Sequence, residues 1–174
     1  ELARRREVEA ALQQAAALQQ AILNSANYSI VSTDVEGTIR TFNQTAERLL
    51  GYNAAEVVGK LTPAFIHDPD EVARRAETLT NELGRKIEPG FEAFVAKARL
   101  GPPDENEWTY IRKDGSRLPV LLSVTALSDA HGRPTGYLGV ASDITERKQY
   151  ERALTEARDA ALESTRLKAE FLAN

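Results

Sequence analysis

Apolar and small residues recur at helical spacing at both ends of the chain, and both ends lack glycine and proline. Residues 1–25 are rich in Ala, Gln, Leu, Arg and Glu, which favour helices. Residues 146–174 form a second run of this kind. Two stripes alternate spacings of three and four: Val8, Leu12, Ala15, Gln19 and Ile22, then Leu154, Ala157, Ala161, Ser164, Lys168 and Phe171. Such stripes are typical of helices that lie alongside a partner helix in a coiled coil.

Between these helices the pattern predicts a small mixed domain. Five segments have the composition and spacing of strands: 28–33, 38–42, 107–112, 118–127 and 136–142. Helical pieces lie between the second and third segments, with start signals at Asn43 and Asp68 and stops at Gly51 and Gly84. Two strands, then helices, then three strands indicate an α+β fold, in which an antiparallel sheet of five strands carries its helices on one face.

Composition excludes several classes of function. The net charge is −4 and the sequence pI about 5.4, which argues against a nucleic-acid binder. No apolar run approaches the roughly 18 residues that a membrane span needs, and no signal peptide is visible. The absence of cysteine removes disulfides, thiolate metal sites and a cysteine nucleophile. No catalytic constellation or metal site is recognisable. Because the chain begins at Glu1 without methionine, we expect a piece of a longer protein.

Five segments carry a resemblance to the PAS sensor-domain family over residues 20–145, and their order and spacing make it specific. They are Asp34–Ile39, Asn43–Tyr52, Glu56–Lys60, Trp108–Gly115 and Asp143–Thr145. The resemblance implies the PAS fold flanked by long signalling helices. It also implies that the strand at 28–33 lies centrally, next to the strand at 136–142.

The flanks resemble the connector into a bacterial histidine kinase, often a hybrid one. Asp143–Lys148 and Lys168–Asn174 carry this resemblance, and the family's phosphoacceptor histidine would lie beyond residue 174. The expected organisation is a dimerisation helix at 1–25, a PAS domain at 26–145 and a coiled-coil connector at 146–174. The resemblance implies a fragment without enzyme activity, in a cytoplasmic kinase that forms a homodimer through these helices and phosphorylates a response regulator.

The resemblance also implies roles for four residues. An acidic residue at the position of Glu56 often pairs with a basic residue near Lys113, although spacing alone favours a capping box between Asn53 and Glu56. Asp143 and Thr145 lie where the sheet passes the signal to the output helix. The alternative is that Asp143 or Thr145 simply caps that helix.

Family cofactors can be compared with the residues present. The photoactive flavin that forms a cysteine adduct is excluded, because the chain has no cysteine. Haem is disfavoured because residues 70–100 contain no histidine, and we expect His67 and His131 at the surface. The basic cluster of dicarboxylate sensors is absent. A non-covalent FAD stays open, with Trp108 and Tyr110 on one strand face as pocket candidates, unless that pair only covers the sheet or is buried under the neighbouring helix.

Overall fold

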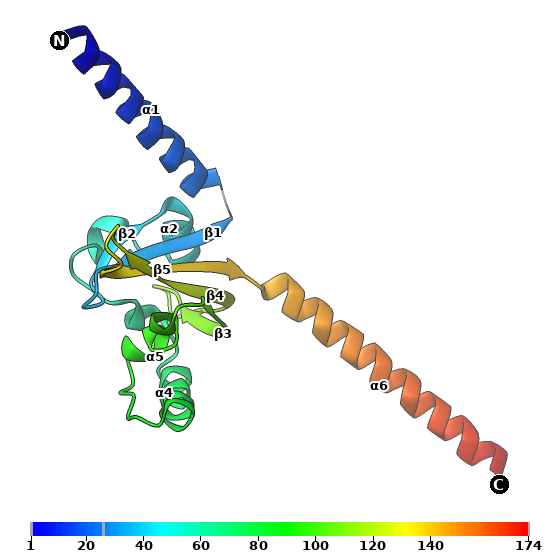
Figure 1. The fold of residues 1–174 in the computed structure, drawn as a ribbon. Coiled ribbons are helices and arrows are strands. Elements are labelled where there is room, and N and C mark those ends of the chain that lie inside the picture. Colours follow the sequence, from blue (N-terminus) through cyan, green and yellow to red (C-terminus); the bar gives the residue numbers. More distant parts are fainter. Residues whose placement is uncertain (1, 26, 174) are drawn as a thin grey trace. The chain divides into compact units, whose positions relative to one another are not determined.

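The computed structural model describes residues 2–25 and 27–173, and its sheet has five strands in the order β2-β1-β5-β4-β3 (Figure 1). The strands are β1 (Tyr28–Thr33), β2 (Ile39–Phe42), β3 (Asp104–Ile111), β4 (Arg117–Ser128) and β5 (Pro134–Asp143). The pairings of β1 with β2 and with β5, and of β3 with β4, are antiparallel, which confirms the predicted fold class. β1 lies beside β5 as the resemblance implied, but β5 holds the middle position.

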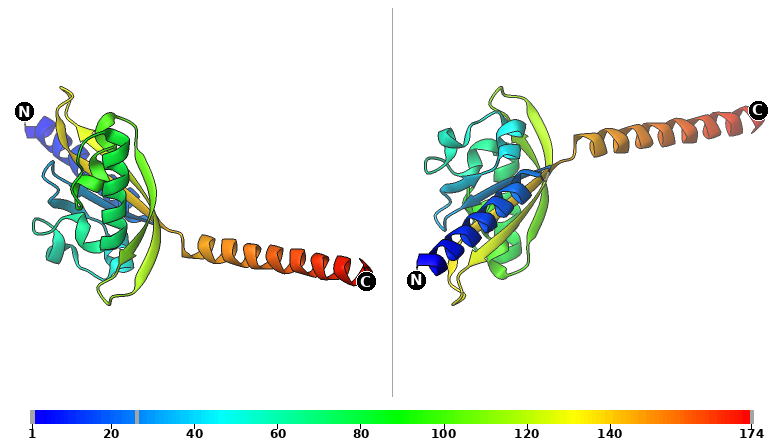
Figure 2. Two further views of the ribbon diagram at one scale, coloured as in Figure 1. Left: turned by 90° about the horizontal axis from the view of Figure 1, so that it is seen from below. Right: turned by 90° about the horizontal axis from the view of Figure 1, so that it is seen from above.

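Helices fill the connection from β2 to β3 and cover one face of the sheet (Figure 2). They are α2 (Gln44–Leu50), α3 (Ala54–Val57), η1 (Pro63–Ile66), α4 (Pro69–Leu83), α5 (Glu92–Val95) and η2 (Ala98–Leu100). The predicted caps are present. Asn43 Oδ1 accepts a hydrogen bond from Ala46 N, and the Asp68 carboxylate accepts from the first turn of α4. Gly51 and Gly84 end α2 and α4 in the left-handed conformation.

The hydrophobic core lies between the inner face of the sheet and these helices. Period-two alternation along β4 turns Leu118, Val120, Leu122 and Val124 inward. One face of α4 buries Val72, Ala76 and Leu79 at helical spacing. A buried side chain, Asn43, joins α2 to the sheet, because its Nδ2 donates to Tyr28 O and its Oδ1 accepts from Ile30 N.

The two terminal helices are α1 (Leu2–Ser25) and α6 (Thr145–Ala173). Residues 143–174 form a structural unit separate from residues 1–142. No described residue of α6 is buried, and its large apolar residues Leu154, Leu167 and Phe171 are exposed, as are Val8 and Leu12 of α1. No helix within residues 2–25 and 27–173 is long and apolar enough to cross a membrane.

Candidate functional site

The core of the PAS-like sheet encloses a small cavity of about 30 Å³. Residues of β1, η1, α5, β3, β4 and β5 line it, and none of them carries a charged side chain. Its polar lining residues are Thr33, His67, Tyr110 and Tyr137. Gly139 leaves room on the β5 side, since it brings no side chain into the lining. The cavity is therefore neutral, mostly apolar and close to the size of a single water molecule.

His67 lies inside this core, so the prediction of a surface histidine was wrong. Its side chain is only 4% exposed, and its ring centroid lies 4.1 Å from that of Phe94 and 4.8 Å from that of Tyr110. Nδ1 lies 2.7 Å from Pro63 O. Because a carbonyl only accepts, Nδ1 carries the proton and Nε2 presents a lone pair. Burial lowers the pKa of His67 to about 4, so the imidazole is neutral near pH 7.

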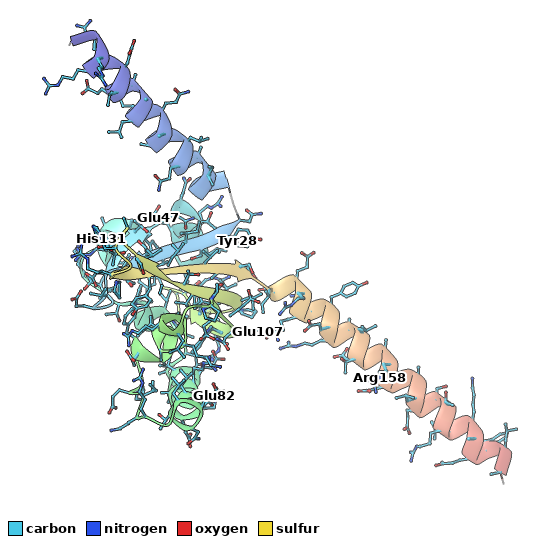
Figure 3. All side chains as sticks on the ribbon, viewed as in Figure 1. Tyr28, Glu47, Glu82, Glu107, His131 and Arg158 are labelled. Carbon is cyan, nitrogen blue, oxygen red and sulfur yellow. The ribbon has the colours of Figure 1, made fainter. Side chains whose placement is uncertain are left out.

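One sequence signal could have indicated this burial. His67 directly precedes Asp68, the N-cap of α4, and the residue before an N-cap often packs against the first turn of the helix. The second histidine follows the prediction. His131 is exposed in the loop between β4 and β5, where its backbone N–H donates to Asp129 (Figure 3).

Trp108 and Tyr110 share the inner face of β3, and both are buried. Tyr110 lines the cavity, and burial raises the pKa of its hydroxyl. Trp108 does not line the cavity: its ring centroid lies 5.0 Å from that of Phe94 and 5.2 Å from that of His67. The structure thus brings both pocket candidates together in one aromatic cluster of the core.

The two family cofactors that carry large rings do not fit this cavity. Binding sites for cofactors of that size usually enclose about 300–1,000 Å³, whereas this cavity encloses about 30 Å³. His67 Nε2 is chemically suited to an iron ligand, but no space for a porphyrin adjoins it. Trp108 and Tyr110 would have to leave their contacts with Phe94 and His67 to admit an isoalloxazine ring. The geometry fits neither FAD nor haem.

Glu56 and Lys113 come together at the surface. Lys113 Nζ lies 2.5 Å from Glu56 Oε1, while Glu56 Oε2 accepts a hydrogen bond from Asn53 N at 2.7 Å. The ion pair and the capping box therefore coexist, each using one oxygen of the carboxylate. The hydrogen bond from Lys113, with help from Asn53, lowers the pKa of Glu56. Lys113 N also donates to Leu50 O, so this residue joins the β3–β4 hairpin to α2 and α3.

Asp143 and Thr145 lie next to each other at the start of α6. Asp143 ends β5, and its Oδ1 accepts a hydrogen bond from Thr145 N at 2.8 Å. Thr145 is the first residue of α6, and Lys148 N donates to Ile144 O in the first turn. This is the bonding expected of a side chain that satisfies a free N–H at a helix start.

The comparisons with known proteins identify the family. A family model described as "PAS domain" matches residues 27–146. The chain belongs to the PAS family. Among solved structures, the PAS domain of an HTR-like protein from Haloarcula marismortui has a TM-score of 0.57 at 22% identity, over 80% of this chain and 99% of that one. At that identity the likeness concerns the fold of this PAS domain.

Relatives of the PAS domain include a two-component system protein and a sensor protein. Two-component system protein A of Emericella nidulans is 32% identical over 148 residues, which is 85% of this chain and 19% of that protein. The C4-dicarboxylate transport sensor protein DctS of Rhodobacter capsulatus is 31% identical over 162 residues, 93% of this chain and 22% of that protein. The chain therefore spans about a fifth of the length of these relatives.

Proposed function

We propose that this PAS domain is a sensory module of a cytoplasmic histidine kinase of the two-component type, and that it relays a signal from its sheet to its terminal helices. One observation carries the proposal: Tyr28 pairs with Ser142 where β1 starts and β5 nears its end. These are the strand ends to which α1 and α6 are covalently attached, and Figure 3 marks Tyr28 at this place. The relatives named as a two-component system protein and as a sensor protein support a parent protein of this type, and the family resemblance suggests the kinase and the response regulator.

The coupling works through the register between β1 and β5. Six residue pairs, from Tyr28–Ser142 to Thr33–Tyr137, join the two strands. A change at the cavity acts on Thr33 and Tyr137 at one end of this ladder, and the helices continue from its other end. Differential stabilisation of two helix arrangements by about 1–3 kcal/mol is the usual scale of such coupling. A ligand-free dimerisation spacer is the second candidate, because side chains fill nearly all of the core.

The proposed domain passes its signal on through a homodimer in which the α6 helices of two copies run parallel. A seam through Ala153, Ala157, Ala160, Ser164, Leu167 and Phe171 also alternates spacings of three and four. This seam and the stripe through Ala161 both contain two large apolar residues, but the seam has no charged member, whereas the stripe includes Lys168, so the seam favours a coiled coil more.

Charge supports the same seam and the parallel direction. One side of this seam carries Glu156, Glu163 and Glu170, and the other side carries Lys168. A parallel pair places Glu163 of one copy opposite Lys168 of the second, where the two charges attract. An antiparallel pair would place the glutamates of the two copies opposite each other.

Cysteine cross-linking distinguishes the seams, since the chain has no cysteine of its own. We expect Ala160→Cys to form disulfide-linked dimers under mild oxidation at least several times faster than Ala161→Cys. The two positions are matched controls, because both are exposed alanines in the middle of α6. Faster cross-linking at residue 161 would support the other stripe, and no cross-linking at either would contradict a parallel α6 pair.

A substitution at Asp143 tests the relay. Asp143→Ala removes the hydrogen bond to Thr145 N, and we expect it to cost the domain about 0.5–2 kcal/mol. In the full-length protein we expect the same change to fix autophosphorylation at a high or a low level. Asp143→Asn keeps an acceptor oxygen and should behave almost as the wild type. A marked fall in melting temperature together with normal regulation would show that Asp143 serves only as a structural cap.

A further inference from the structure

Two residues that line the cavity each have a buried polar atom without a hydrogen-bond partner among the described residues. These atoms are Thr33 Oγ1, from the end of β1, and His67 Nε2, next to the end of η1. Each buried polar atom without a partner destabilises the folded protein, because its lost hydration is not replaced. Native proteins leave few such atoms, and a buried water is a common partner. Two of them on residues that line one cavity indicate a binding site.

The chemistry of the site follows from the two atoms. His67 donates from Nδ1 to Pro63 O, so its Nε2 can only accept a hydrogen bond. The Thr33 hydroxyl can donate or accept. A molecule that bridges them must therefore carry at least one donor. An anion would meet a lone pair at Nε2 and would lose its hydration without a compensating cation, because no lining residue is charged.

The size of the site limits the molecule to one or two heavy atoms. A water needs roughly 10–15 Å³ of such volume, and the cavity offers about 30 Å³. Gly139 is part of the reason for this space. A Cβ added there would lie 3.3 Å from Leu122 Cδ1, another lining atom, and would reduce the volume without touching either polar atom.

We infer that the cavity is a binding site for a small neutral hydrogen-bond donor, held between His67 Nε2 and Thr33 Oγ1. Water occupies it in the resting protein, and a small alcohol such as methanol competes for it. This inference does not depend on the helix relay, because it concerns only the cavity of the PAS core. It assigns the site a ligand class far smaller than a flavin and different in charge from a dicarboxylate.

The test uses the 174-residue chain with methanol, xenon and acetate as probes, observed by NMR. In the wild type, methanol should shift signals of Thr33 and His67, and the ¹⁵N shift of His67 Nε2 should report an accepted hydrogen bond. In the variant with both His67→Phe and Thr33→Val, the methanol response should fall at least tenfold, and the cavity should bind xenon, because dry apolar cavities take up this gas. Acetate should produce no response in either protein.

Gly139→Ala is the matched control, since it keeps both polar atoms and fills the space. It should abolish the response to methanol in the wild type and the response to xenon in the double variant. The ¹⁵N measurement on the wild type keeps the test decisive even if the double variant folds poorly. The inference is overturned if Nε2 of the wild type accepts no hydrogen bond, if the wild type binds xenon but not methanol, or if acetate binds more tightly than methanol.

Discussion

Replacing Gly136 with alanine should destabilise the domain far more than the same change at Gly132. Gly136 has φ +155°, and a Cβ there would lie 2.0 Å from the backbone oxygen of Thr33. No flexible side chain can relieve this clash, because the atom it meets belongs to the paired strand β1. We expect Gly136→Ala to lower the free energy of unfolding by about 3 kcal/mol or more.

Gly132 is the matched control because it lies close by, in the loop before β5. Its φ is +74°, but a Cβ there would have nothing within 4 Å. Only the conformational penalty remains, about 1–2 kcal/mol. Urea unfolding of the two variants gives the comparison. Equal losses of stability would mean that the backbone of β1 at Thr33 leaves enough space for a side chain at position 136, contrary to the prediction.

Helix boundaries could be predicted from the sequence because their causes are local. Asn43 and Asp68 accept hydrogen bonds from N–H groups two or three residues away, and Gly51 and Gly84 adopt the left-handed conformation that ends a helix. These signals depend on residue type and short spacing only. The same holds for the hydrogen bond between Asp143 and Thr145, which spans two residues.

The start of β3 could not be predicted in this way. The strand begins at Asp104, three residues before the predicted start at Glu107. Its first residues are acidic or amidic and show no apolar alternation. They belong to the strand because they pair with β4, Asp104 opposite Val124 and Glu105 opposite Ser123. Pairing with a distant segment is a tertiary effect, which outweighs the low strand propensity of these residues.

In the candidate site, too, local features could be predicted from the sequence, whereas features that depend on tertiary contacts could not. The contact of Glu56 with Lys113 was named through the family resemblance, and spacing named the capping box, but neither could indicate that one carboxylate makes both. The cavity depends on contacts between six elements, so composition alone left it open. Trp108 and Tyr110 were placed correctly on one strand face, yet only Tyr110 reaches the cavity.

The stability of the domain should fall by about 3 kcal/mol between pH 7 and pH 4 because of His67 alone. Burial holds the pKa of its imidazole at about 4 in the folded protein, against an ordinary value of 6.5. Between these values the unfolded chain binds a proton that the folded domain does not, so stability decreases as the pH falls. One pKa unit corresponds to about 1.4 kcal/mol, which gives the stated loss at pH 4.

His67→Phe provides the control, because phenylalanine keeps an aromatic ring among Phe94, Trp108 and Tyr110 but cannot bind a proton. The free energy of unfolding of both proteins is measured in urea at pH 7, 6, 5 and 4. Acidic groups whose pKa is lowered, such as Asp68 with its hydrogen bond from Arg117, also lose stabilisation below about pH 5, but they do so in both proteins alike. The variant should therefore lose much less stability than the wild type between pH 6.5 and 4. The same slope in both proteins would mean that the folded domain admits a charged imidazole, and the neutral acceptor at Nε2 would no longer be available to a ligand at that pH.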